Sequence, residues 1–436
     1  MSTAPQLKRV LGPVHLWAIA VGLVISGDYF GWNYGLAKGG PLGMMAATLI
    51  ITVLYVCFIF SYTELSTAIP HSGGPYAFAR RAFGPFVGYI AGIATLIELV
   101  FAPPAIARAI GAYVHFRVPE LPVNAVAIGA FALFCGINAV GVGIAATFEL
   151  VITAVAAFEL FLFFTLTGPS VDVSRIIDAG LPFGARGIFD AIPFAIWFYL
   201  AIEGVAMSAE EVKRPERDIP IGYVAGILTL VTLALGTLVC TTGVLPWEAL
   251  TQDDSPLPKA LAAVLSPSHP MTHLMVYLGL FGLIASLHGI IMGYSRQVFA
   301  LARDDLLPSF LARVHPRFGT PVFAIVVPGA IGCAAVLTER TDAIITLSVL
   351  GAVTLYMVSM LSLFKLRTRE PSLARPFRAP LYPVTPAIAL CLSAIAFIAV
   401  VASDVTVALI YLALLLVAAL AYYGSSSTKR MSSRSP

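Results

Sequence analysis

Long apolar blocks follow one another along almost the whole chain. A helix that crosses a bilayer needs ~20 mostly apolar residues, and a helix satisfies its own backbone hydrogen bonds inside the hydrocarbon. Of the 436 residues, 59% are hydrophobic and only 11% are charged, whereas about 25% charged is typical of a soluble domain. The sequence therefore predicts an all-α integral membrane protein with no room for a folded aqueous domain.

Twelve blocks are expected to form transmembrane helices. Because the first block is long and no small-residue cleavage site precedes the second, we do not expect a cleaved signal peptide. The approximate limits of the blocks are Val14–Leu36, Leu42–Ser66, Phe86–Tyr113, Val123–Val140, Ile144–Gly168, Ala191–Ala209, Ile221–Val244, His273–Leu301, Val322–Thr338, Ala343–Leu366, Val384–Ala402 and Val405–Tyr423.

Lysine and arginine are unevenly distributed between the two sides of the expected bundle. With the N-terminus inside, nineteen of the 26 basic residues fall on the inner side, and an excess of Lys and Arg marks cytoplasmic loops. We therefore expect a multi-pass protein of the bacterial plasma (inner) membrane with both termini in the cytoplasm, and no nucleic-acid partner. The nineteen are Lys8, Arg9, Arg80, Arg81, Lys213, Arg214, Arg217, Arg296, Arg303, Arg313, Arg317, Lys365, Arg367, Arg369, Arg375, Arg378, Lys429, Arg430 and Arg434.

The five cysteines give no sign of a disulfide framework or a metal site. Their number is odd, no CxxC motif occurs, and all lie in expected helices, so we interpret them as small packing residues. Neither a metal nor a cofactor is predicted. The five are Cys57, Cys135, Cys240, Cys333 and Cys391.

Two expected helices are interrupted by an acid and a glycine. Ser26-Gly27-Asp28 lies in the first, and Glu203-Gly204 lies in the sixth. This pattern is typical of a five-plus-five inverted repeat, in which the first helix of each half unwinds and its freed backbone lines a central site. The repeats would cover residues 14–168 and 191–366, and residues 384–423 would add two C-terminal transmembrane helices.

A second correspondence supports the repeat. The stretch GGPYAFARRAFG lies between the second and third blocks, and SPLPKALAAVLS lies between the seventh and eighth. Both begin at prolines and continue as short helix-like pieces, and they fall on opposite sides of the membrane, as inverted halves require. Short connectors also resemble one another by chance, so this stays an interpretation.

Five acids and one histidine are expected inside or nearly inside the spans, without a lysine to pair with them. An ionised carboxylate at mid-bilayer costs ~3 to over 10 kcal/mol unless it is paired or wetted. An unpaired excess of acid makes a negative cavity that attracts a cation or carries protons. The six are Asp28, Glu98, Glu149, Glu159, Glu203 and His288.

Asp28 and Glu203 are the leading candidates because each lies at a helix interruption. For Asp28 we expect direct binding of a substrate ammonium; a hydrogen bond to unwound backbone amides and a proton relay remain alternatives. Glu203 is interpreted either as a substrate contact or as a backbone cap or proton carrier. Glu98, expected in a wall of the site, could contact the ligand, carry protons or hydrogen-bond to another helix.

The remaining ionisable groups are less diagnostic. Glu159 and His288 are candidates for proton coupling, because imidazole titrates in the useful range, although a packing role for His288 is the simpler interpretation. Glu149 lies near the cytoplasmic end of its block and is interpreted as solvated.

Polar and aromatic residues beside the interruptions complete the candidate binding site. Ser26 and Gly27 would offer a hydroxyl and an unwound backbone. Tyr29, Trp197 and Tyr199 would hold an ammonium over their rings, which gains roughly 0.5–2 kcal/mol. Plain packing is the alternative for each aromatic.

Three longer stretches resemble motifs of one transporter superfamily. PHSGGPYAFARRAFG, FYLAIEGVAMSAEEVKRPERDIP and SRQVFALARDDLLP are similar to the loop, sixth-helix and eighth-helix motifs of the amino acid–polyamine–organocation (APC) superfamily, and SGDYFGWNYGL resembles its ethanolamine permease branch. The resemblance implies the leucine-transporter-like fold, with a 5+5 inverted repeat, broken helices 1 and 6, and two extra C-terminal helices. It also implies secondary transport by alternating access.

Two departures from the superfamily pattern concern the substrate and the coupling ion. Amino acid carriers usually have G-[ST]-G-I-F in helix one, where backbone amides hold the substrate carboxylate. Asp28 in the corresponding SGDYF would repel a carboxylate and attract an ammonium. Glu159 lies near the position at which some members of the superfamily carry a lysine that is thought to replace sodium. This chain has no lysine in that helix, so that mechanism is not carried over.

The sequence thus predicts a secondary active permease that imports a small primary amine, with ethanolamine as the favoured substrate. Coupling of this import to H⁺ is one option. An amino acid or polyamine permease is the alternative. An enzyme is disfavoured because no HExxH or GxSxG motif occurs in the sequence. A channel is disfavoured because the sequence shows no selectivity-filter motif. The charged stretch EEVKRPERDIP, together with Arg80 and Arg81, is expected to form an inner gate or simply a solvated loop.

Overall fold

The protein is a bundle of helices in a computed structural model that describes residues 9–140 and 145–432, except for the side chains of residues 145–146 and 425–432. No strand occurs in these ranges, and the single isolated bridge joins Leu11 to Val212. The α-helices are α1 (Pro13–Val24), α2 (Ser26–Tyr29), α3 (Leu36–Ala68), α4 (Pro75–Phe83), α5 (Pro85–Arg117), α6 (Val123–Val140), α7 (Ala145–Thr167), α8 (Ser174–Ile177), α9 (Gly184–Trp197), α10 (Pro215–Val244), α11 (Pro256–Leu265), α12 (Pro270–Arg303), α13 (Val322–Val336), α14 (Thr341–Arg369), α15 (Val384–Ser403) and α16 (Val405–Ser432). The 3-10 helices are η1 (Trp32–Gly35), η2 (Gly168–Ser170), η3 (Ile202–Glu211), η4 (Trp247–Leu250) and η5 (Ser309–Ala312).

Ten helices of the described residues are long and apolar enough to cross a membrane. Two expected spans, the first and the ninth, fall instead in the shorter apolar helices Pro13–Tyr29 and Val322–Val336. The first is short because it breaks, and the ninth ends before the polar connection at residues 338–340, which leads into α14. The all-helical membrane class is therefore confirmed, and the count of twelve spans stays a prediction.

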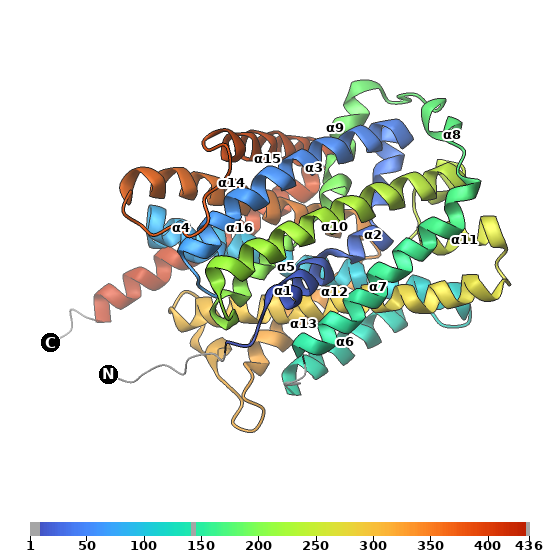
Figure 1. The fold of residues 1–436 in the computed structure, drawn as a ribbon. Helices are drawn as coiled ribbons and strands as arrows, with labels where there is room; N and C mark the ends of the chain where they lie inside the picture. The colour runs from blue at the N-terminus through green and yellow to red at the C-terminus, as the bar shows by residue number, and fades with distance from the viewer. Residues whose placement is uncertain (1–8, 141–144, 433–436) are drawn as a thin grey trace.

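The two chain ends leave the bundle on the same side (Figure 1). The connector helix α4 lies at that end, whereas α8 and α11 lie at the opposite end (Figure 1). This is the arrangement expected for the two proline-started connectors. Of the basic residues used to predict the orientation, Lys8 and Arg434 lie outside the described residues, as does Ile144 at the start of the fifth block.

The first helix breaks later than the sequence suggested. Residues 26–29 form the helical turn α2, so Ser26-Gly27-Asp28 is not unwound. The break falls at Phe30, which is extended, and at Gly31, which has φ 90°. Only glycine adopts a positive φ without steric cost, which explains why the chain turns at Gly31. Asp28 sits in the last helical turn before this break.

The sixth helix breaks earlier than the sequence suggested. Helix α9 ends at Trp197, and Ala201 takes a left-handed conformation with φ 77°. Glu203-Gly204 then lies in the first turn of η3 rather than in the break. Gly204 has a packing role instead, because a Cβ there would lie 2.7 Å from Leu23 Cδ1.

We expect Gly31→Ala to destabilise the protein by ~1–3 kcal/mol, because alanine is strained at this φ and its Cβ would lie 3.0 Å from Ile345 Cδ1. The apparent melting temperature in detergent measures this. Gly129→Ala is the matched control, since position 129 lies in α6 with open space around it and alanine favours a helix. Equal melting of Gly31→Ala and wild type would contradict the strained break.

Candidate functional site

Asp28 is a fully buried carboxyl at the end of a half-helix. Its exposure is 0%, and neither carboxyl oxygen has a donor among the described residues. Tyr29 follows Asp28 in the same helical turn. Tyr199 follows Phe198, whose backbone packs against Gly27. Because the C-terminal end of a helix carries a partial negative charge, the end of helix 13–29 and the Asp28 carboxyl act together to favour a cation.

The first helix meets the sixth at Gly27, in the helical turn before its own break. A Cβ at this position would lie 3.1 Å from Phe198 Cα, so the backbones meet closely enough to exclude any side chain. Aromatic rings extend the contact: Trp32 stacks on Phe198 and Phe30 meets Trp197 edge-on, each pair with centroids 5.6 Å apart. Residues separated by about 170 positions thus form one compact site.

Trp197 lies along residues 27–31 with an unused donor. Position 27 faces its backbone and position 31 faces its indole ring. Its Nε1 is buried and has no acceptor among the described residues. The site therefore combines an unpaired carboxyl from the first helix with an unpaired N–H donor from the sixth.

Ser26 contributes its backbone to a different contact. Its N–H donates to Ser286 Oγ at 3.0 Å, and that hydroxyl donates to Gly22 O at 2.6 Å. The interaction fixes the end of the first half-helix to α12.

Glu98 and Glu203 form a second acidic group. Glu98 comes from the middle of α5 and Glu203 from the start of η3, and their carboxyls face each other closely enough to interact. Tyr356 donates to Glu203 Oε2 at 3.3 Å. The other three carboxyl oxygens of the pair lack a well-formed hydrogen bond, so this pair is also poorly satisfied.

Tyrosines join the two acidic groups. The hydroxyls of Tyr55 and Tyr356 lie 2.8 Å apart, and the Tyr55 and Tyr199 rings lie 5.0 Å apart. Tyr199 also shares a hydrogen bond of 2.7 Å with Thr52. Sequence reasoning missed Tyr55 and Tyr356, whose only local signal is a hydroxyl in the middle of an apolar helix.

Tyr29 and Glu159 are brought together outside the immediate site. The Tyr29 hydroxyl lies 2.6 Å from Glu159 Oε2 and 3.0 Å from Ala156 O, so it points towards α7. A Cβ at Gly282 would lie 2.8 Å from Tyr29 Cζ, which shows that α12 closes on the ring. Tyr29 therefore has partners of its own and links the first helix to α7.

The interpretation of Glu149 as solvated is wrong. Its side chain is 4% exposed and its two oxygens have no donor among the described residues. The carboxyl faces Gly22 of α1 and lies near Gly289 of α12. The sequence places Glu149 near the end of an apolar block, and this position alone does not show that α1 and α12 cover its carboxyl.

His288 is surrounded by α6 and α7. Its Nδ1 lies 3.0 Å from Asn138 Nδ2, and its ring meets the rings of Phe134 and Phe148 edge-on. These neighbours do not come from the helix breaks.

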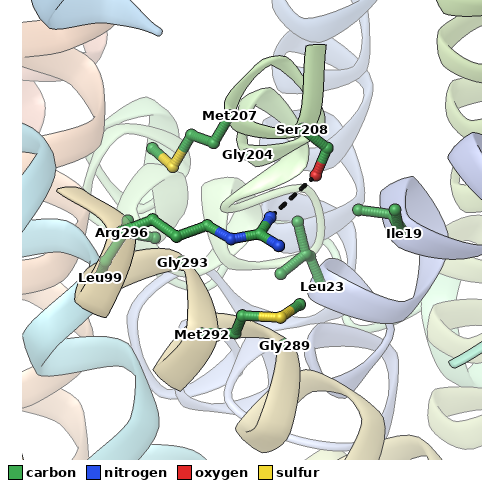
Figure 2. A pocket seen from close by; sticks show the side chains of 10 residues that line it. All are labelled: Ile19, Leu23, Leu99, Gly204, Met207, Ser208, Gly289, Met292, Gly293 and Arg296. Carbon is green, nitrogen blue, oxygen red and sulfur yellow. Dashed lines mark hydrogen bonds between the residues drawn. The ribbon is translucent and has the colours of Figure 1, made fainter. Parts of the chain in front are cut away.

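At the end of the bundle that carries the chain termini, Arg296 joins two helices. Figure 2 shows this side chain reaching from α12 across a small pocket towards Ser208, between Met207 and Met292. Its Nη1 lies 3.2 Å from Ser208 Oγ, and its Nη2 lies 2.9 Å from Glu211 Oε1. The ion pair joins η3 to α12 at the end of the bundle that carries the chain termini.

Arg80 and Arg81, which we expected to act with EEVKRPERDIP in a gate or a solvated loop, have their ion-pair partners outside that stretch. Arg80 pairs with Asp304 at 2.5 Å, and Arg81 pairs with Glu370 at 2.6 Å. The Arg81 guanidinium holds the pKa of the Glu370 carboxyl below its usual value. These contacts still join separate parts of the same end of the bundle, because the partners belong to α4 and to the segments after α12 and α14.

The opposite end is closed by a polar network around Asp254. Tyr34 donates to Asp254 Oδ1 at 2.6 Å, and Arg108 Nε lies 3.5 Å from Asp254 Oδ2. Asn33 donates to the backbone oxygens of Leu250 and Asp253. Both ends of the buried site are thus covered by interactions that join different helices.

The described residues offer no alternative metal centre. They contain no group of three or more His, Cys, Asp or Glu side chains that could hold a metal ion, and the five cysteines are free.

Comparisons with known proteins agree on one family. A family model described as amino acid permease matches residues 11–420. An uncharacterized transporter of Rhizobium meliloti is 32% identical over 92% of this chain and 89% of its own length. The branched-chain amino acid permease BcaP and the methylthioribose transporter of Bacillus subtilis are each 24% identical, over 88% and 89% of this chain and 86% and 87% of their own lengths.

Proposed function

Because the chain belongs to the amino acid permease family, and is thus a membrane transporter of the APC superfamily rather than an enzyme, we propose that it carries a small primary amine, with ethanolamine as the favoured substrate. Alternating access is the proposed mechanism. The observation that carries the substrate assignment is the unpaired, fully buried carboxyl of Asp28.

The substrate's charge follows from the surroundings of Asp28. A carboxylate buried without a partner is unfavourable, and an ammonium beside it would provide the missing charge and three donors. A substrate carboxylate would meet both Asp28 and the negative end of helix 13–29. The site therefore favours an amine that carries no carboxylate.

The amino alcohol has a second polar group to be recognised. Its hydroxyl oxygen can accept from Trp197 Nε1, which lies beside Gly31 and has no acceptor among the described residues. Tyr199 adds an aromatic face to which the ammonium is attracted. The ammonium of ethanolamine would thus pair with the Asp28 carboxyl, and its hydroxyl would pair with the Trp197 indole N–H.

Alternating access would use the two closed ends in turn. The inner end depends on Arg296 with Glu211, and the outer end on Asp254 with Tyr34 and Arg108. The network around Asp254 joins the two proposed repeats, at 14–168 and 191–366, so motion of one repeat against the other would break it. Arg296 and Glu211 both belong to the second repeat, so opening at that end would require α12 to move relative to η3. The excess of basic residues near the chain termini supports an inner-membrane orientation with both termini cytoplasmic.

Proton coupling is proposed for Glu98 and Glu203. Two carboxyls that face each other in a buried site are most easily held with one shared proton. Tyr55, Tyr356 and Tyr199 connect this pair to the neighbourhood of Asp28, so binding of an ammonium and loss of the proton would influence each other. Glu159 and His288 remain secondary candidates, and both have polar partners.

An amino acid or polyamine permease is the alternative. The relative described as a branched-chain amino acid permease and the cationic amino acid transporter 2 of Arabidopsis thaliana support it by their names. A cationic amino acid carries an ammonium that Asp28 could hold, together with a carboxylate that it would repel.

In a titration panel on purified protein, ethanolamine should bind more tightly than serine, alanine, lysine or putrescine. Serine is the sharpest comparison, because it is ethanolamine with a carboxylate added. Isothermal titration measures the affinities. If serine or lysine binds more tightly than ethanolamine, the amine assignment is wrong and the protein is an amino acid carrier.

Asp28→Asn should preserve the fold and weaken ethanolamine binding by roughly two to three orders of magnitude. Removing one partner of a buried charge pair typically costs ~3–5 kcal/mol, while asparagine keeps the size of the side chain. Affinity is measured on monodisperse protein, with Asp178→Asn as an exposed control acid. If well-folded Asp28→Asn binds within about threefold of wild type, Asp28 is a structural residue.

Uptake of labelled ethanolamine into proteoliposomes should rise with an inward proton gradient and fall when a protonophore collapses it. Glu98→Gln should flatten this response, because glutamine cannot release a proton, while ethanolamine binding persists. Equal rates with and without the gradient, at matched internal pH, would exclude proton coupling. A normal gradient response in Glu98→Gln would instead remove Glu98 from the coupling path.

A further inference from the structure

A separate groove lies on the lipid-facing side of the bundle, away from the helix breaks. It has a volume of about 560 Å³ and runs between α5, α13, α14 and α16. Ile331 and Ile410 on its rim are 49% and 48% exposed, and both come from helices whose outer faces are apolar. Its walls are formed by Phe101, Ile331, Ile344, Leu347, Ile410 and Leu414.

One part of the groove is polar and charged. Arg340 precedes α14 and Asp404 precedes α16, and both line the groove with Thr338 and Thr406. Arg340 uses Nε for an ion pair of 3.2 Å with Asp342, which leaves its two terminal nitrogens available. Asp404 accepts from Val407 N through Oδ1, and its charge acts on Arg340.

We propose that this groove binds one phospholipid with a zwitterionic, ammonium-bearing headgroup. The acyl chain would lie along the apolar walls. The headgroup phosphate would meet the free nitrogens of Arg340, and its ammonium would meet Asp404.

The position of the charges supports a lipid. Arg340 and Asp404 lie just outside the membrane-spanning helices, at the level where headgroups meet the hydrocarbon, whereas the apolar walls continue along the spans. An apolar trough that ends in a cation and an anion matches the chemistry of a phospholipid in both parts.

The local charge selects the headgroup. Arg340 and Asp404 line the mouth with one charge of each sign, and Asp342, which pairs with Arg340, adds a second negative charge beside them. An anionic headgroup would be attracted by the Arg340 guanidinium but repelled by the carboxylates of Asp342 and Asp404. A zwitterionic headgroup pairs with both signs, and phosphatidylethanolamine is therefore expected to bind better than phosphatidylglycerol.

Native mass spectrometry of the full-length protein in mild detergent tests the site. Ala334→Trp fills the groove from the exposed face of α13, and Ala154→Trp on the exposed face of α7 is the matched control. Wild type and Ala154→Trp should retain one phospholipid, and Ala334→Trp should retain at least tenfold less. Equal retention in the two tryptophan variants would overturn the site.

Titration with defined lipids tests the headgroup. Wild type should bind phosphatidylethanolamine several-fold more tightly than phosphatidylglycerol, and Asp404→Asn, which keeps a capping side chain, should lose this preference. Arg340→Gln should weaken binding of both lipids. A preference for phosphatidylglycerol in wild type would overturn the headgroup assignment, and a dimer that Ala334→Trp dissociates would identify the occupant as a second copy of the chain.

Discussion

The close contact between the first and sixth helices, beside their breaks, is the constraint on which the central site depends. Gly27 meets the backbone of Trp197 and Phe198 with no space for a Cβ. Backbone groups freed by unwinding inside a bilayer must find partners within the protein. Tyrosine hydroxyls supply two of them, because Tyr113 donates to Tyr29 O and Tyr223 donates to Glu203 O. The same packing that satisfies the breaks therefore brings the acids of both helices into one region.

Buried acids in this protein fall into two kinds that the sequence alone does not distinguish. Glu64 is 1% exposed, yet Arg367 and Arg375 pair with it at 2.6 and 3.2 Å, and Ala379 N donates to it. This carboxylate is fully satisfied and joins α3 to the end of α14 and to the segment between α14 and α15. Asp28 is as deeply buried and has no such partners, and this difference supports a ligand role for Asp28 and a structural role for Glu64.

The two ends of the bundle and the lipid-facing groove relate the site to its surroundings. An ion pair joins η3 to α12 at the end of the bundle that carries the chain termini, and a network around Asp254 covers the opposite end. The groove mouth lies close to that network in the chain, since Arg340 precedes Thr341, which both accepts from Arg108 and donates to Asp254. A lipid held at Arg340 would therefore border this network.

The sequence by itself determined the membrane class, the helical architecture and the family, because block length, composition and contiguous motifs are local properties. It also singled out Asp28 and Glu203, since any acid in an apolar span is costly and stands out. Only the tertiary structure decided where the helices break, at Gly31 and Ala201, because these positions depend on how two distant helices pack. The burial of Glu149, the facing pair of Glu98 and Glu203, and the ion-pair partners of Arg80, Arg81 and Arg296 depend in the same way on residues far apart in the chain. No local pattern records such contacts, because they exist only after the helices have packed together.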